Sequence, residues 1–319
     1  MFPIQSTTED SSKLFVDDVF AVHLYTGNGS TQTINNGIDL AGKGGLVWCK
    51  SRSGSENNGL FDTLRGGNSI LASNSTNTAQ VPSAPVTFLS NGYSHAGSGT
   101  GNSTSTTYVS WTFRKAPKFF DVVTWTGNGV ESRQISHSLG IEPGMIIVKC
   151  TSFAGTEWKV FHRSLSSTWG MILNNTGAQS IGVWPATQPT SSSFYVTSGG
   201  DFNANGQTYV AYLFAHDPSA DGIIQCGIGT SLNLGWEPQF VLFKNPTGTS
   251  NWEILDTARG WANADNAANG LRPNTAEAEQ QWNFGSPTAT GTNALSGATQ
   301  MIYLAIRRPN KPPTSGTQV

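Results

Sequence analysis

The stretch FDVVTWTGNG, residues 120–129, occurs in closely similar form 100 residues earlier as FAVHLYTGNG, residues 20–29. In the first of these, apolar and polar positions alternate before a Gly-Asn-Gly turn, which is the pattern of a β-strand followed by a tight turn. A third copy, around CGIGT (226–230), keeps a glycine but not the asparagine. A strand and turn that recur at this distance indicate an internal repeat.

Three further landmarks recur in the same order. An apolar run ends in lysine in GGLVWCK (44–50), PGMIIVK (143–149) and PQFVLFK (238–244). It is followed by GLFDTLRG (59–66), KVFHRSLS (159–166) or EILDTARG (253–260), and each copy closes with TYVSWTFRK (107–115), TYVAYLFAH (208–216) or QMIYLAIRR (300–308). Lys50 and Lys149 are 99 residues apart, and Lys149 and Lys244 are 95 apart. We therefore predict three divergent copies of one unit of about 100 residues.

The composition favours an all-β protein with many turns. Of 319 residues, 12% are charged and 10% are aromatic, and the net charge of −2 offers no attraction to nucleic acid or anionic lipid. No apolar run reaches the length of a membrane span, and the N-terminus lacks the pattern of a secretory signal. Cys49, Cys150 and Cys226 lack metal-ligand spacing and are predicted to be small apolar residues in strands, without a disulfide.

The second copy predicts about seven strands, among them MIIVKC, a continuous apolar run typical of a central strand buried on both faces. We predict an all-β fold of three tandem antiparallel β-sandwiches, jelly-roll-like, arranged around a pseudo-threefold axis. The only helical candidate is a short turn or two in TAEAEQQW (275–282). The predicted organisation is an N-terminal arm (1–14), sandwiches at 15–118, 119–217 and 218–309, and a C-terminal tail (310–319).

Two Asp-x-x-Arg pairs recur, Asp62 with Arg65 and Asp256 with Arg259. They could hold a glycan through a carboxylate and a cation, or they could close a turn after a strand, with the aspartate accepting backbone N–H groups. The second copy has His162 and Leu165 instead, so the structural interpretation is favoured.

Catalysis has little support in the sequence. There is no nucleophile elbow, no H-E-x-x-H motif and no phosphate-binding loop, and the five histidines lack ligand spacing. We predict a protein without catalytic residues, metal or cofactor.

Several tryptophans lie between the repeat landmarks, in apparently irregular segments: Trp169, Trp184, Trp261 and Trp282. An aromatic ring in a loop can stack on the apolar face of a sugar, or it can cover the end of a sandwich. Packing is the favoured role, and Trp169, Trp261 and Trp282 are the candidates for glycan or receptor contact.

Several longer phrases resemble a domain of virion structural proteins from marine tailed bacteriophages, mostly tail fibres or related tail proteins. They include FVDDVF (15–20), RKAPKFFDVVTWTGNG (114–129), HSLGIEPGMIIVK (137–149), TYVAYLFAHD (208–217) and LGWEPQ (234–239), and the resemblance extends over about residues 15–309. It implies a virion component near the host-recognition apparatus and carries over no catalytic residue.

The resemblance further implies other virion proteins as partners, a host-surface glycan or receptor, and a homotrimer, with neither nucleic-acid binding nor membrane insertion. Three functions stay open. The first is a tail fibre or tail appendage for host attachment, the second a capsid decoration or head-fibre protein, and the third a polysaccharide depolymerase. A carboxylate pair in an open groove would favour the depolymerase.

Overall fold

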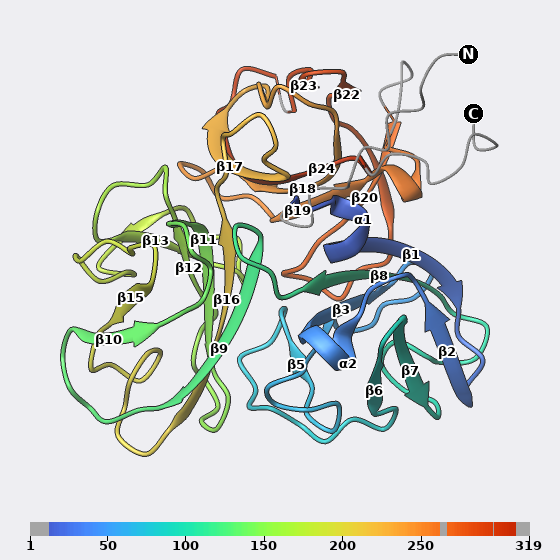
Figure 1. The fold of residues 1–319 in the computed structure, drawn as a ribbon, viewed down its shortest axis with the longest axis horizontal. Helices are drawn as coiled ribbons and strands as arrows, with labels where there is room; N and C mark the ends of the chain where they lie inside the picture. Colours follow the sequence, from blue (N-terminus) through green and yellow to red (C-terminus); the bar gives the residue numbers. More distant parts are fainter. Residues whose placement is uncertain (1–12, 262–266, 296, 311–319) are drawn as a thin grey trace, which may run out of the picture.

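The strands form three groups around a common centre (Figure 1), here called units 1 (15–118), 2 (119–217) and 3 (218–309). The computed structural model describes residues 13–261, 267–295 and 297–310. Each unit has one larger antiparallel sheet and one smaller sheet. The predicted all-β antiparallel sandwich fold is confirmed. The predicted N-terminal arm and C-terminal tail lie almost entirely outside the described residues.

The elements follow one another in a similar order in the three units. Unit 1 contains α1 (Val16–Val19), β1 (Phe20–Thr26), β2 (Thr31–Asn35), α2 (Leu40–Lys43), β3 (Gly45–Ser51), β4 (Gly59–Asp62), β5 (Leu71–Ala72), β6 (Val86–Leu89), β7 (Gly92–Ala96) and β8 (Thr107–Arg114). Unit 2 contains β9 (Phe120–Thr126), β10 (Arg133–Ser136), β11 (Pro143–Cys150), β12 (Lys159–His162), β13 (Trp169–Ile172), β14 (Ser180–Ile181), β15 (Ser193–Val196) and β16 (Thr208–Ala215). Unit 3 contains β17 (Ile224–Gly229), β18 (Pro238–Lys244), β19 (Glu253–Asp256), η1 (Thr257–Arg259), β20 (Ala267–Leu271), β21 (Gln280–Asn283), β22 (Pro287–Thr288), β23 (Gly291–Thr292) and β24 (Met301–Arg307).

The larger sheets share one strand order. They run β1-β8-β3-β4-β5, β9-β16-β11-β12-β13-β14 and β17-β24-β18-β19-β20-β21, so the first strand of each unit lies beside its last. The strand that carries the repeated lysine follows next. The smaller sheets are β2-β7-β6, β10-β15 and β22-β23. Equivalent residues of the three units can therefore be compared strand by strand.

One hydrophobic core joins the three larger sheets. Its buried side chains come from all three units, and the Phe113 ring lies 5.4 Å from Phe214 and 6.1 Å from Phe240. In unit 1, side chains that alternate with these, such as Val47 and Phe61, pack instead with residues of the smaller sheet. Each larger sheet is thus covered on both faces. Strand β11 is buried along its whole length, which confirms the prediction of a central strand at this place. Without its neighbours, a unit would expose the inner face of its sheet.

The two Thr-Gly-Asn-Gly turns are held by one buried asparagine each. Asn102 Oδ1 accepts from Asn28 N (3.1 Å), and Asn203 Oδ1 accepts from Asn128 N (3.2 Å). Gly29 and Gly129 have φ of 68° and 70°, the left-handed region that favours glycine. The resemblance between the two turns therefore extends to the side chain that fixes them.

The helical turn predicted within 275–282 is wrong. This segment is extended and ends in β21, which pairs with β20. Its backbone groups bond to unit 1: Thr275 O accepts from Asn58, Ala276 O from Lys50, and Glu279 N donates to Arg52 O. These contacts replace the hydrogen bonds that a helix would make.

The cysteine prediction is confirmed. All three cysteines are buried and unpaired, and they lie in β3, β11 and β17.

Candidate functional site

The repeated lysines lie at the interfaces between units. Each is buried, and each Nζ donates to a carbonyl of its own unit and to a carbonyl of another unit. The contacts to the other unit are Lys149 to Thr76 O (3.3 Å), Lys244 to Thr176 O (3.1 Å) and Lys50 to Ala276 O (2.8 Å). Burial lowers the pKa of each lysine to about 8. The three contacts define a first interface (units 1 and 2), a second (units 2 and 3) and a third (units 3 and 1), so the three units close into a ring.

Two further hydrogen bonds recur at every interface. A backbone N–H of one unit donates to the carbonyl two residues beyond the lysine of the next: Ala79 to Thr151 (2.8 Å), Gln179 to Pro246 (2.7 Å) and Glu279 to Arg52 (2.9 Å). A side chain also donates in the opposite direction: Trp158 Nε1 to Ala72 O (3.0 Å), Trp252 Nε1 to Ile172 O (2.9 Å) and Asn58 Nδ2 to Thr275 O (2.8 Å). The three interfaces therefore share a backbone hydrogen bond and a side-chain donor, which is tryptophan at the first two and asparagine at the third.

At the first interface, the Asp62–Arg65 pair closes a turn and also reaches unit 2. Asp62 Oδ1 accepts from the backbone N–H of Arg65 (2.9 Å), and Oδ2 accepts from Arg65 Nε (2.5 Å) and from the Tyr212 hydroxyl (2.9 Å). Arg65 Nη2 donates to the same hydroxyl (3.1 Å). Burial raises the pKa of Tyr212 well above its ordinary value, so the phenol keeps its proton.

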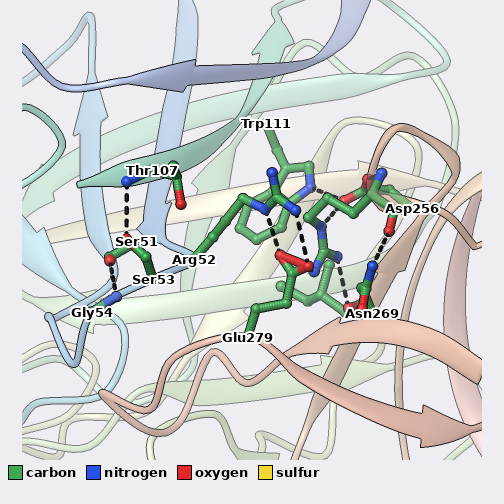
Figure 2. Close-up of polar contacts among 11 residues, drawn as sticks. Ser51, Arg52, Ser53, Gly54, Thr107, Trp111, Asp256, Asn269 and Glu279 are labelled. Carbon is green, nitrogen blue, oxygen red and sulfur yellow. Dashed lines mark hydrogen bonds and ion pairs between the residues drawn. The ribbon is translucent and has the colours of Figure 1, made fainter. Parts of the chain in front are cut away.

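At the third interface, the Asp256–Arg259 pair makes the corresponding contacts, and Figure 2 shows Asp256 beside Trp111 and Arg52 beside Glu279. Asp256 Oδ2 accepts from Arg259 Nε (2.7 Å) and from Trp111 Nε1 of unit 1 (2.9 Å). The Arg259 side chain is fully buried, and its guanidinium lies 5.5 Å from the Trp111 ring centre. Arg52 of unit 1 forms a bidentate ion pair with Glu279 of unit 3, at 2.5 and 3.1 Å. This interface therefore holds a network of four charged side chains.

At the second interface, His162 takes the place of the aspartate. Its Nδ1 accepts from Ser164 N (3.2 Å), so the ring proton lies on Nε2, which donates to Tyr303 O of unit 3 (3.0 Å). The ring is buried, and burial lowers its pKa to about 4. The strand position that carries Trp111 in unit 1 and Tyr212 in unit 2 carries Leu304 in unit 3, which has no side-chain donor. The neutral histidine instead bonds a backbone carbonyl.

The tryptophan candidates lie in different surroundings. Trp261 is 1% exposed and donates from Nε1 to Gly285 O (2.8 Å), so it is a core residue of unit 3 and offers no face to a ligand. Trp169 and Trp282 are partly exposed and belong to β13 and β21, not to loops. The Arg272 guanidinium covers the Trp282 ring at 4.3 Å. No ring contact between Trp169 and the other two occurs in the part of the chain that the structure describes.

Sequence reasoning missed the partners across the interfaces, Trp111, Tyr212, Arg52 and Glu279. A signal was present for two of them, since Trp111 and Tyr212 occupy the same place in the closing strand and both have a polar tip.

Among residues 13–261, 267–295 and 297–310, no cluster of metal-binding side chains is found, and no helix is long and apolar enough to cross a membrane.

Comparison with the profiles of known protein families identifies a family. The profile of a family described as "Domain of unknown function (DUF7483)" matches residues 16–291, most of the chain and parts of all three units. No curated protein matches the sequence.

Proposed function

We propose that this chain, which belongs to the DUF7483 domain family, is a virion structural protein of a tailed bacteriophage. In the virion it forms a tail fibre or a tail-associated appendage that takes part in attachment to the host surface. Under this proposal the protein is not an enzyme. The phrases that resemble marine phage tail proteins, such as RKAPKFFDVVTWTGNG (114–129), support this proposal.

One observation carries the proposal: two sets of ionisable residues at equivalent positions of the three units connect the units to one another. Lys50, Lys149 and Lys244 bond carbonyls of other units, and Asp62, His162 and Asp256 each contact the last strand of another unit. Ionisable groups that are hydrogen-bonded in this way hold the three units of the folded chain together. Such use supports a structural role over a catalytic one.

The homotrimer is a separate part of the proposal. Three units already close around a common centre within one chain, so a trimer would be a second level of assembly. Light scattering on the purified chain tests it, because a trimer has three times the 33.9 kDa mass of one chain.

Cryo-electron microscopy of the intact particle tests the location. We expect copies at the tail, in multiples of three. Copies spread over the capsid lattice would overturn the tail assignment in favour of a decoration protein. A purified chain that lowers the viscosity of host surface polysaccharide would overturn the non-enzymatic assignment.

A further inference from the structure

One difference between the first and third interfaces lies beside the backbone hydrogen bond that both share. At the third, the backbone bond between Glu279 and Arg52 is accompanied by their side-chain ion pair. At the first, the same backbone bond joins Ala79 and Thr151, whose side chains are short and uncharged. Next to Thr151 lies an open groove of about 420 Å³ between units 1 and 2. The counterpart of Arg52, Thr151, therefore lines an open groove at the first interface, with no arginine side chain to extend into it.

The groove is lined by hydroxyl groups and an aromatic pair. Thr124, Thr126 and Thr208 line it from unit 2 with exposed side chains. Trp125 and Tyr209 form its floor, with their rings stacked on each other at 5.3 Å and an interplanar angle of 14°; both residues are buried, so the threonines provide the accessible surface. Trp125 Nε1 donates to Phe202 O, which holds the indole in place. Threonine hydroxyls both donate and accept, so the walls can match ligand hydroxyls in either direction.

The groove offers no unpaired charge. Arg65 is the charged residue among those that line it, and its Nε is ion-paired with Asp62. Its other nitrogens donate to Ser69, to Leu60 O and to Tyr212. A charged ligand would thus gain little from Arg65, whereas a neutral, hydroxyl-rich ligand would meet the donors and acceptors of the exposed threonines.

An extended peptide fits this place less well. The groove runs beside β9, the edge strand of the unit 2 sheet, where a peptide could add as a further strand. Leu64, which is 48% exposed, lines both this groove and a second hollow farther along β9. It therefore divides the edge of β9 into two short parts, and strand addition needs a continuous edge.

We propose that the groove at the first interface binds a neutral oligosaccharide. This inference rests on the proposed attachment function and deepens it by naming the class of ligand. The ligand would contact Leu64 and Arg65 of unit 1 and the threonines of unit 2, and so bind across two units.

Isothermal titration calorimetry on the full chain tests this inference, with laminarihexaose, maltohexaose and cellohexaose as neutral probes. We expect at least one of them to bind with a dissociation constant on the order of 1 mM. The double variant A79E/T151R introduces the third-interface ion pair with its arginine at a position that lines the groove, and it is expected to weaken binding about tenfold or more. Thr126→Arg fills the groove from an exposed position. It is the variant to test if the double variant does not fold. R52T/E279A, which removes the natural ion pair but leaves the groove, is the control and should bind like the wild type.

Absence of binding by all three probes would overturn the inference. Equal binding by the wild type and the groove-filling variants would also overturn it, because the site would then lie elsewhere. Tighter binding of a sulfated hexasaccharide would overturn the neutral ligand class. Because purified protein is used, each of these results is independent of where the chain sits in the virion.

Discussion

At the third interface, the Asp256–Arg259 pair meets Trp111 beside a second ion pair, whereas at the second interface a neutral histidine meets a backbone carbonyl. Both arrangements join the end of the fourth strand of one larger sheet to the last strand of another unit. The difference teaches that the closed arrangement of three units requires a polar contact between the fourth strand and the neighbouring last strand, but not a particular residue type. The two chemistries should nevertheless respond differently to mutation, pH and salt.

The largest effect is expected for Arg259→Ala. It would leave the buried Asp256 carboxylate without its cation, and removal of one partner from a buried pair costs about 3–5 kcal/mol. Urea unfolding measures the change in the free energy of unfolding. The matched variant D256H/R259L copies the second interface and should lose less, because it leaves no unpaired charge. A loss below about 1 kcal/mol in R259A would contradict the buried charge network.

Among the three interfaces, the second holds a buried histidine, His162, that responds to mild acid. His162 has a folded-state pKa of about 4, below its unfolded value of 6.5, so the unfolded chain binds the extra proton between these values. Stability is therefore fully present above pH 6.5 and falls as the pH drops toward 4, by at most about 3 kcal/mol for this residue. His95 and His216, whose pKa values burial also lowers to about 4, add losses of the same sign. Burial raises the pKa of Glu253 to about 7, which has the opposite sign in this range and offsets about one histidine.

Thermal unfolding between pH 7 and 4 measures this effect. His162→Asn can still donate to Tyr303 O but does not titrate in this range, so its acid-induced loss should be smaller than that of the wild type. An identical pH profile in the two proteins would contradict a role for His162.

A smaller effect is expected for Tyr212→Phe at the first interface. The variant removes a hydroxyl that donates to Asp62 and accepts from Arg65, and a lost buried hydrogen bond costs about 1–2 kcal/mol. Tyr195→Phe, on a partly exposed position of β15, is the matched control for urea unfolding. Equal losses in the two variants would show that the Tyr212 hydroxyl adds nothing to the interface.

The smallest effect is expected for Arg52→Gln. The Arg52–Glu279 pair is partly exposed, and such pairs contribute about 0.2–1 kcal/mol. The difference between wild type and variant should shrink at high salt, since ions screen the pair. A difference that is unchanged in 1 M salt, an ionic strength at which the screening length is about 3 Å, would indicate that the pair is shielded from solvent.

Much of the local structure was predictable from the sequence. The alternation in FDVVTWTGNG corresponds to β9 and its turn, and the apolar run at 143–150 is β11. The Asp-x-x-Arg turns were predictable too, because an aspartate that follows a strand accepts nearby backbone N–H groups. The extended conformation of 275–279 was not predictable, since its backbone partners lie more than 200 residues away in unit 1.

By itself, the sequence determined the repeated landmarks, the antiparallel strands and the residues that line each face of a sheet. These follow from periodicity and turn chemistry, which act over a few residues. Only the tertiary structure decided that Trp261 is buried, that Asp62 and Asp256 reach Tyr212 and Trp111, and that a groove remains at the first interface. The physical reason is that these properties depend on how three sheets pack around one core, where contacting residues are about 150 positions apart in the chain.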